Sequence, residues 1–362
     1  MQGPNPGERV VVALSGGVDS AVAALLLRER GLEVHGLYMS NWEEDDAYCT
    51  SARDYQDARS VARELGVVLH RVSFARQYRD QVFRGFLDDI AAGRTPNPDV
   101  ICNREIKFGV AQAYARRLGG AWLATGHYAR LARGADGPML LKAVDESKDQ
   151  SYFLHAVPRP EFARVLFPLG GLQKADVRAH ARRAGLPVHD KPDSTGICFI
   201  GERPFAQFLA RYVPERPGPI ETLDGRRLGT HRGLPFYTLG QRAGLGIGGR
   251  ADAAAEPWYV ARKDPERNAL LVAQRREPRA LETCALRCGP VNWLAPVPEL
   301  GFEAGVKVRY RQADQAARLE PDGRGGIVAR FEAPQRAVTP GQYAVFYAGP
   351  RCLGGAVIEE TL

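Results

Sequence analysis

The chain has 362 residues, of which 44% are hydrophobic and 25% are charged. These fractions are those of a globular protein and exclude disordered, collagen-like and fibrous classes. The best candidate for a membrane span, residues 10–27, is interrupted by Ser15, Asp19 and Ser20 and lacks the ~18 consecutive apolar residues that a span needs. The first eight residues are polar and do not resemble a signal peptide. We therefore expect a cytoplasmic protein of about two or three domains with no membrane partner.

The chain is basic, because 49 lysine and arginine residues outnumber 42 acidic ones and give a net charge of +7. After residue 205 there are 22 basic residues against 17 acidic ones. This excess favours a polyanionic partner such as nucleic acid, although coding bias towards arginine would produce it as well. The six cysteines include no C-x-x-C pair, which predicts reduced thiols and no metal site.

The first part of the chain alternates between strand-like and helix-like segments. Residues 9–14 are an apolar, β-branched run typical of a buried parallel strand. The next predicted elements are a helix over 19–30, a strand over 33–39, a helix over 52–65, a strand over 67–72, helices over 78–92 and 105–118, and a strand over 121–125. This alternation predicts an α/β domain over residues 1–204, in which a doubly wound parallel sheet binds ligands at the carboxyl ends of its strands.

After residue 205 the helical periodicity fades. Short β-type runs between Gly and Pro turns predict a small β-rich central domain over residues 205–275. Further strand-like segments follow at 306–310, 326–331, 343–347 and 356–358, with the spacing of a small barrel or sandwich. A C-terminal β domain is therefore predicted over residues 276–362.

The motif Ser15-Gly16-Gly17-Val18-Asp19-Ser20 lies between the first predicted strand and the first helix. Backbone N–H groups and the positive end of the helix dipole can hold a phosphate there, and we favour this interpretation over a merely structural turn. No Walker A sequence exists in the chain. The motif resembles the signature of the ATP pyrophosphatases, in which magnesium and loop amides hold the pyrophosphate. A second glycine-rich stretch, 244–249, neither follows a strand nor opens a helix, so we interpret it as a surface loop, with RNA backbone as a candidate contact.

Two cysteines lie in polar segments that are rich in Pro or Gly. Cys102 lies in the run 96–103, which we predict to be extended because of its prolines and to precede a helix that opens near Arg104. A thiol near a helix N-terminus is biased towards the thiolate, and Asp99 is a candidate acid or base beside it. Cys198 lies in the segment 194–201. Together they suggest paired thiol chemistry, against the alternative of inert buried residues.

Nine separated segments stand in the order and spacing of the tRNA-specific 2-thiouridylases, so the chain resembles this family from about residue 9 to 358. These enzymes replace the 2-oxygen of the wobble uridine with sulfur. The segments are 15–20, 41–46, 96–108, 125–128, 148–154, 194–201, 233–249, 309–312 and 339–342. The resemblance implies an ATP-pyrophosphatase domain of the adenine nucleotide alpha hydrolase type, then a central β domain and a C-terminal β-barrel that binds tRNA.

The same resemblance implies roles for individual residues. The implied ATP-binding residues are Ala13, Leu14, Ser15, Gly16, Gly17, Val18, Asp19, Ser20, Met39 and Gly126. The implied tRNA contacts are His127, Lys148, Asp149, Gln150, Arg309, Tyr310 and Gln342, with Asn97, Pro98 and Asp99 at the target base. Cys198 is implied to carry a persulfide, Cys102 to attack or resolve it, and Asp99 to assist as acid or base.

The implied reaction begins with adenylation of the uridine 2-oxygen by ATP, accompanied by Mg²⁺. A persulfide on Cys198, loaded by a cysteine desulfurase or a sulfur-relay protein, then supplies sulfur in one of two ways. Either Cys102 releases hydrosulfide, or the persulfide attacks the base directly and Cys102 resolves the bond. Both routes leave a transient Cys102–Cys198 disulfide.

Three other interpretations stay open at this point. The chain could be an amide-forming ATP pyrophosphatase, or a non-catalytic, nucleotide-dependent RNA-binding module with inert cysteines. Alternatively, Asp99, Cys102 and Cys198 could hold an iron–sulfur cluster, although their spacing matches no known cluster run.

Overall fold

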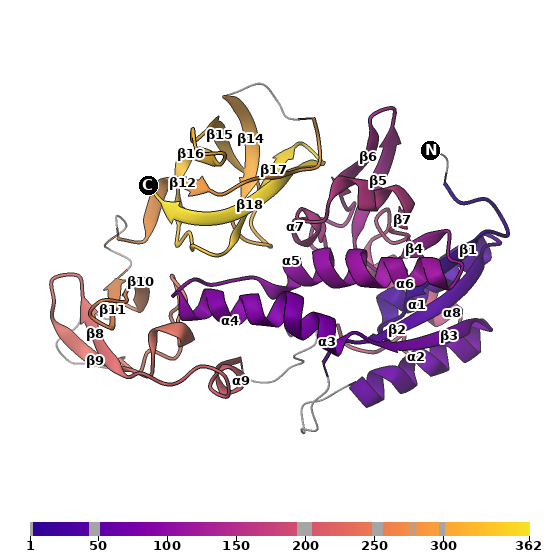
Figure 1. Cartoon of the computed structure of the whole chain (residues 1–362), viewed down its shortest axis with the longest axis horizontal. Helices are drawn as coiled ribbons and strands as arrows, with labels where there is room; N and C mark the ends of the chain where they lie inside the picture. Colours follow the sequence, from indigo (N-terminus) through magenta and orange to yellow (C-terminus); the bar gives the residue numbers. More distant parts are fainter. Residues whose placement is uncertain are drawn as a thin grey trace.

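The computed structural model describes residues 3–42, 51–193, 205–247, 256–274, 277, 280–296 and 301–362. Within these ranges the chain builds three β structures: a parallel sheet flanked by helices, a small central sheet and a C-terminal barrel (Figure 1). Among the described residues, no helix is both long and apolar enough to cross a lipid bilayer.

The N-terminal sheet has five parallel strands in the order β3-β2-β1-β4-β7. Their bounds are β1 Arg9–Ala13, β2 Glu33–Ser40, β3 Val68–Ser73, β4 Trp122–Ala124 and β7 Val165–Leu166. Successive side chains of a strand point to opposite faces, so Val10 and Val12 enter one core and Val11 enters another. Both faces of the sheet are therefore buried.

Helices cover each face of this sheet. The core around Val10 and Val12 is completed by α1 (Val18–Glu29), α2 (Ser51–Leu65) and α8 (Lys174–Arg183). The core around Val11 is completed by two long helical stretches that change their winding. They are α3 (Ala75–Tyr78), η1 (Arg79–Phe83) and α4 (Arg84–Ala91), then α5 (Pro98–Cys102), η2 (Asn103–Val110) and α6 (Ala111–Arg117). The predicted doubly wound α/β fold is confirmed.

The helix that carries Cys102 begins earlier than predicted. The sequence predicted an extended run up to a helix start near Arg104, but the helix starts at Pro98, after an extended Asn97 with φ −118° and ψ 95°. Proline suits the first helical position, because no intrahelical partner is needed for the missing N–H there. Cys102 and Asp99 consequently lie on the helix itself and not in a loop before it.

Between the two parts of the parallel sheet, the chain forms a hairpin that the sequence analysis did not predict. It consists of β5 (Ala129–Gly134) and β6 (Gly137–Lys142). Short helices α7 (Ser151–Leu154) and η3 (Arg159–Arg164) follow before β7. The hairpin continues onto the C-terminal barrel, because Leu141 of β6 pairs with Arg351.

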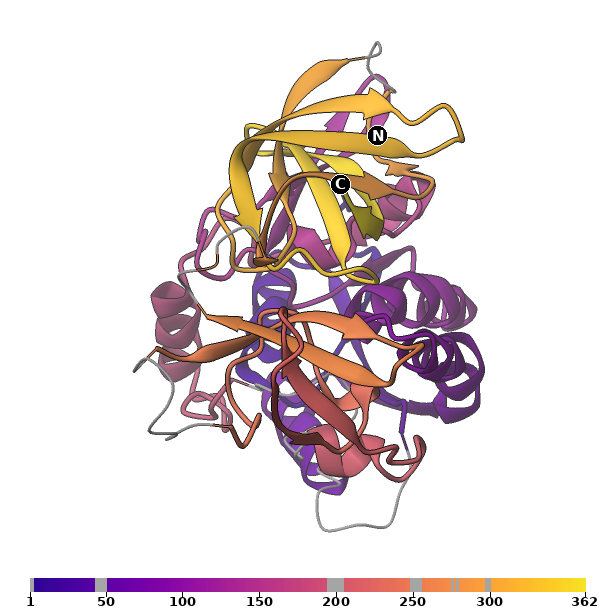
Figure 2. The same cartoon turned by 90° about the vertical axis from the view of Figure 1, so that its left-hand side faces the viewer.

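The central sheet has the order β10-β11-β8-β9 (Figure 2). Its strands are β8 Gly218–Thr222, β9 Arg227–His231, β10 Trp258–Asp264 and β11 Ala269–Gln274, and it is accompanied by α9 (Phe205–Leu209) and η4 (Leu234–Phe236). The described part of the glycine-rich stretch, 244–247, is loop without a helix, as predicted. It is not wholly a surface loop, however, because Leu245 and Ile247 are buried in the core of this sheet.

The C-terminal strands close into a six-stranded barrel in the order β12-β16-β15-β14-β17-β18, because β12 and β18 pair with each other. The strands are β12 Glu282–Cys288, β14 Phe302–Lys307, β15 Gln315–Pro321, β16 Ile327–Arg336, β17 Tyr343–Ala348 and β18 Arg351–Thr361, with β13 Asn292–Trp293 beside β18. The predicted strand over 306–310 ends at Lys307, because the Val308 amide donates to Gln312 Oε1 in a turn. The barrel is confirmed, and the domain boundaries stay a prediction.

Candidate active site

The predicted phosphate loop lies at the carboxyl end of β1 and leads into α1. The Ser20 hydroxyl donates to the Gly17 carbonyl at 3.0 Å and accepts from the Ser15 amide at 3.2 Å. Gly16 has φ +80°, and a Cβ there would lie 2.3 Å from the Asp54 carbonyl oxygen. Only glycine fits such a position, so Gly16 allows the loop to pass close against α2.

Gly126 joins this loop from the neighbouring strand. It follows β4, and a Cβ on it would lie 2.8 Å from the Ser20 nitrogen and 2.9 Å from the Asp19 carbonyl carbon. Met39 stands near the carboxyl end of β2, which pairs with β1 on its other side. The carboxyl ends of three neighbouring strands thus bring the predicted ATP-binding residues to one edge of the sheet.

A charged network surrounds Asp19, the acidic residue of the loop. The Lys174 ammonium, at the start of α8, donates to Asp19 Oδ1 at 2.7 Å and to Oδ2 at 2.8 Å, and it also reaches Asp193 Oδ1 at 2.8 Å. The Tyr128 hydroxyl donates to Asp19 Oδ1 at 2.8 Å. Burial and the nearby Asp19 carboxylate raise the pKa of Tyr128, so this phenol remains a donor.

Asp193 is held by three cations. Lys148 donates to its Oδ2 at 2.8 Å, and Arg178 donates to its Oδ1 at 2.9 Å, beside the contact from Lys174. Burial raises the pKa of Asp193, but the hydrogen bonds from Lys148 and Lys174 outweigh this effect and lower the pKa to about 2. Asp193 is therefore ionised at neutral pH. It is also the last described residue before the segment that contains Cys198.

Lys191 connects the loop to α2. Its ammonium donates to the Gly16 carbonyl at 3.1 Å, to Asp54 Oδ1 at 2.7 Å and to Asp57 Oδ2 at 2.6 Å. The sequence analysis missed both Lys174 and Lys191. One signal was available, because only seven of the 49 basic residues are lysines. In an arginine-rich chain, a retained lysine indicates a position that needs a compact cation.

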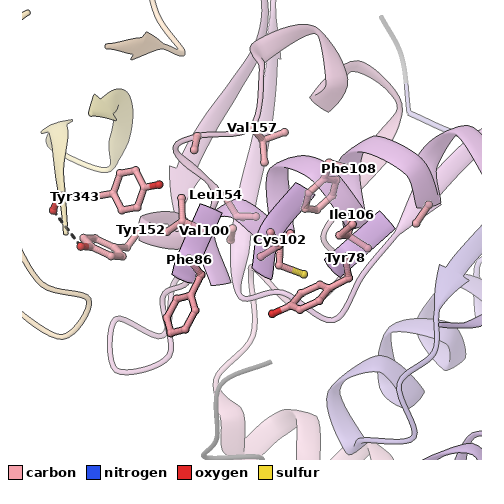
Figure 3. Close-up of a cluster of buried hydrophobic side chains, with 14 of the residues drawn as sticks. Tyr78, Phe86, Val100, Cys102, Ile106, Phe108, Tyr152, Leu154, Val157 and Tyr343 are labelled. Carbon is pink, nitrogen blue, oxygen red and sulfur yellow. Dashed lines mark hydrogen bonds between the residues drawn. The ribbon is translucent and has the colours of Figure 1, made fainter. Parts of the chain in front are cut away.

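Cys102 lies in the buried core between the sheet and the helices, with 1% of its surface exposed. Val100, Ile106, Phe108 and Tyr78 surround it, and its sulfur is directed to the side where Tyr78 lies (Figure 3). Asp99, one helical turn earlier, is partly exposed. Cys198, and with it the predicted Cys102–Cys198 disulfide, lies outside the described residues.

The helix of Cys102 and the phosphate loop meet the same segment, 125–128. The His127 ring packs between Phe108 and Phe167, at centroid distances of 5.9 Å from each, and His127 directly follows Gly126. Its Nδ1 lies 2.7 Å from the Thr125 hydroxyl. Burial, and secondarily the charge of Lys107, lowers the pKa of His127 well below its usual value, so the ring is neutral. His127 thus lies between the phosphate loop and the helix of Cys102. Only 8% of its surface is exposed.

Several predicted tRNA contacts are engaged within the protein. Gln150 Oε1 accepts from the Tyr128 amide at 2.9 Å, and the buried Asp149 accepts from the Ser151 hydroxyl at 2.8 Å. Lys148, as described, pairs with Asp193.

The predicted tRNA contacts on the barrel are also bonded to the chain. Arg309 donates to the Ala337 carbonyl at 2.7 Å, and Gln342 Nε2 donates to the Thr95 carbonyl at 2.7 Å. The Tyr310 ring packs on Phe153 at a centroid distance of 4.4 Å. The barrel therefore rests on the segments that precede α5 and follow Lys148.

Two polar side chains after β2 are buried and have no hydrogen-bond partner among the described residues. Asn41 is 2% exposed, and within the described part of the chain neither its Nδ2 nor its Oδ1 has a partner. The same holds for Trp42 Nε1, on a ring that packs against Tyr78 and Phe83. Buried amides are normally satisfied, so an exception at a ligand-binding edge points to function. The sequence analysis included Asn41 in a family motif but gave it no role.

The described ranges contain no group of three or more His, Cys, Asp or Glu side chains that could hold a metal ion. Asp99 and Cys102, the two described members of the alternative iron–sulfur set, lie three residues apart on one helix. Cys198, the third member of this set, lies outside the described residues.

Three family models match the chain in succession. They are described as the tRNA methyl transferase HUP domain over residues 8–202, the tRNA methyl transferase PRC-barrel domain over 206–274 and the aminomethyltransferase beta-barrel domain over 283–358. A protein of Hahella chejuensis named tRNA-specific 2-thiouridylase MnmA is 52% identical over 357 residues, which cover 98% of each chain. A protein of Halorhodospira halophila with the same name is 54% identical over 359 residues, covering 98% of this chain and 94% of that one. With this identity over nearly its whole length, the chain belongs to the tRNA-specific 2-thiouridylase family.

Proposed function

We propose that this protein catalyses the ATP-dependent 2-thiolation of the wobble uridine of tRNA. The observation that carries the proposal is the match to 2-thiouridylases over 98% of the chain. Two of the matching domains are described as tRNA methyl transferase domains, but the relatives that match all three domains together are named 2-thiouridylases, which favours thiolation. The site supports this choice, since the predicted phosphate loop and the helical stretch that carries Cys102 both contact the segment 125–128.

The first step uses the edge formed by 13–20, Met39 and Gly126. The uridine 2-oxygen attacks the α-phosphorus of ATP, whose accompanying magnesium enters with the nucleotide, and pyrophosphate leaves. The loop amides and the N-terminus of α1 stabilise the departing negative charge. Lys174 neutralises Asp19 of this loop and Lys191 holds the Gly16 carbonyl, so the loop can receive phosphate charge without a Walker lysine. The product is a uridine whose 2-oxygen is part of an AMP leaving group.

The second step replaces that oxygen with sulfur. We propose that Cys198 carries a persulfide and that Cys102 opens it. In one route the Cys102 thiolate attacks the Cys198 sulfur and expels hydrosulfide, which adds to carbon 2 and displaces AMP. In the other, the terminal persulfide sulfur adds to carbon 2 and displaces AMP, and the Cys102 thiolate then attacks the Cys198 sulfur and releases the thiocarbonyl product. Both form a Cys102–Cys198 disulfide, which an external thiol reductant must reduce before the next turnover.

Cys102 is 1% exposed, so in this scheme binding of the substrate must bring the persulfide to it. The partly exposed Asp99 can exchange protons with solvent or base. Asn97, Pro98 and Asp99 would meet the flipped target base, as a base must leave its stack to be modified. His127, Lys148, Asp149, Gln150, Arg309, Tyr310 and Gln342 would hold tRNA directly or through the contacts described above.

We propose two partners and a cellular compartment for the reaction. A cysteine desulfurase or a sulfur-relay protein would load the persulfide, and tRNA would be the substrate. We place the reaction in the cytoplasm. The boundaries 1–204, 205–275 and 276–362 are proposed as the catalytic, central and tRNA-binding domains.

Reconstitution tests the function. Purified protein is incubated with a tRNA transcript bearing a wobble uridine, ATP, cysteine, a cysteine desulfurase and a thiol reductant, and nucleosides are analysed by mass. We expect 2-thiouridine together with tRNA-dependent pyrophosphate release, and a transcript with cytidine at the wobble position is the control. Pyrophosphate release without a sulfur-containing nucleoside would favour an amide-forming pyrophosphatase. Binding of tRNA without pyrophosphate release would favour a non-catalytic RNA-binding module.

A further inference from the structure

The turn that precedes the Cys102 helix, residues 93–97, is held by both of the other domains. From the barrel, the Pro340 carbonyl accepts from the Thr95 amide at 3.0 Å, and Gln342 donates to the Thr95 carbonyl at 2.7 Å. From the central sheet, the Lys263 ammonium donates to the Gly93 carbonyl at 3.2 Å. The turn therefore takes its position from side chains and backbone that lie far away in sequence.

Gly93 ends α4 in a backbone conformation that glycine favours. Its φ is +78°, and the Gly93 and Arg94 amides close the helix on the carbonyls of Ile90 and Asp89. This is a Schellman motif, in which the residue after the helix needs the left-handed conformation that glycine adopts. The remaining hydrogen-bonding group of Gly93, its carbonyl, is the one that Lys263 contacts.

The contact lies at the wall of a cavity of about 900 Å³ between the three domains. Gly93, Thr95, Lys263, Thr339 and Pro340 all line it. In Figure 1 the end of α4 and the start of α5 lie on the side of the N-terminal domain that faces the central sheet and the barrel. The turn packs on the barrel at Gly341 and borders this cavity on another side, where the Lys263 hydrogen bond reaches it.

Lys263 is unusual among the cations of its domain. It is the only lysine between residues 192 and 306, in a region that is rich in arginine. Among the described residues no carboxylate forms an ion pair with it, and burial lowers its pKa to about 8. A half-buried ammonium without a counter-ion is unfavourable, so its placement on one helix-terminal carbonyl indicates a specific use.

We propose that Lys263 is a positioning residue for the thiolation reaction: by anchoring the Gly93 carbonyl, it sets the start of α5 and so the placement of Asn97, Asp99 and Cys102. This inference rests on the proposed function, because it assigns a role in that same reaction. Lys263 touches neither substrate nor reacting atoms in this scheme. Its effect on the rate arises because small displacements of reacting groups are costly to catalysis.

The experiment compares Lys263→Met with Arg262→Met. Arg262 is the exposed neighbour on β10, so both variants lose one positive charge at nearly the same place. At saturating tRNA and ATP, we expect Lys263→Met to lower kcat for 2-thiouridine formation by about tenfold or more, with KM for ATP unchanged. Arg262→Met should keep the wild-type kcat. Lys263→Arg should recover most of the activity, because a guanidinium can donate to the same carbonyl.

Hydrogen exchange separates positioning from general destabilisation. In Lys263→Met we expect faster exchange of the amides of residues 93–102 and an unchanged melting temperature. If that variant does not fold, Lys263→Gln takes its place in the same comparison. Wild-type kcat in Lys263→Met, or a folded Lys263→Arg that is no better than Lys263→Met, would overturn the inference. A wild-type protein that thiolates no tRNA would instead overturn the proposed function, so the two failures are distinguishable.

Discussion

The Lys174 ammonium lies 2.7 Å and 2.8 Å from the two carboxylate oxygens of Asp19. Lys174 is the first residue of α8 and Asp19 the second residue of α1, so two helix starts meet at the carboxyl edge of the parallel sheet. The same ammonium contacts Asp193, which precedes the Cys198 segment. One side chain therefore joins the loop that would hold ATP to the part of the chain that would carry sulfur.

Lys174→Met should abolish the first half-reaction. Without this cation the loop has an uncompensated Asp19 carboxylate, which repels phosphate, so tRNA-dependent pyrophosphate release should fall by about 100-fold or more while tRNA binding is kept. Lys142→Met is the control, because Lys142 pairs with Asp314 of the barrel and not with the loop. Normal pyrophosphate release by Lys174→Met would show that the loop receives its positive charge elsewhere.

Asn41→Leu should stabilise the fold and lower the thiolation activity. Among the described residues the buried Asn41 amide has no partner for either polar atom, and an unsatisfied buried polar group costs about 1–3 kcal/mol. Leucine has the same branched shape, is somewhat larger and has no polar atoms, so the free energy of unfolding should rise by about 1 kcal/mol. Thiolation should fall if the amide serves substrate, because its donor and acceptor would be lost. Unfolding in urea and kcat/KM measure the two effects, and a fully active Asn41→Leu would leave the amide without a function.

The sequence was sufficient for strands β1 to β4 of the parallel sheet, because they are apolar runs separated by helices of ordinary length. Val10, Val11 and Val12 show this well: three adjacent valines predict a strand buried on both faces, and they enter two different cores. The two-residue β7 was not predicted. The β5–β6 hairpin was missed because its strands contain arginine and glycine and lack a clear apolar alternation. The start of α5 was missed because a proline was taken to exclude a helix, whereas the first turn tolerates it.

The candidate site likewise has one part that the sequence located and one part that it did not. The loop 15–20 has a local signature, so sequence alone located it. The network of Asp19, Lys174 and Asp193 joins residues up to 174 positions apart, and no local pattern distinguishes these charges from those of a solvated surface. Contacts such as Gln342 with Thr95 likewise depend on how the barrel docks, which hydrophobic periodicity does not encode.

Acid should weaken the packing of the barrel on the N-terminal domain through His155. Burial lowers the pKa of His155 to about 4, only partly offset by the hydrogen bond of Nδ1 to the Tyr152 carbonyl, and its ring packs on Tyr343 of the barrel. The unfolded chain, with an ordinary histidine pKa, binds the proton first. Stability is therefore complete above about pH 6.5 and is lost as the pH falls towards 4, by about 3 kcal/mol in total.

Denaturant unfolding at pH 7 and pH 5 measures this loss. His155→Gln retains a donor for the Tyr152 carbonyl but cannot titrate, so the difference between the two pH values should shrink by about 2 kcal/mol in this variant. An equal pH dependence in both proteins would assign the acid sensitivity to other groups, such as Asp193, whose lowered pKa acts only nearer pH 2 to 4.

Serine variants of Cys198 and Cys102 should block the thiolation reaction at different steps. Cys198→Ser should take up no labelled sulfur from a desulfurase but should still release pyrophosphate with tRNA, because adenylation needs only ATP, magnesium and a correctly held base. Cys102→Ser should accept the label at Cys198 yet form little 2-thiouridine, since nothing opens the persulfide or resolves the bond. Cys352→Ser is the control, because Cys352 is equally buried but lies on β18 of the barrel. Alkylation followed by peptide mass analysis locates the label. Label on Cys102 in the Cys198→Ser protein would reverse the two roles, and full thiolation by either variant would remove paired thiols from the mechanism.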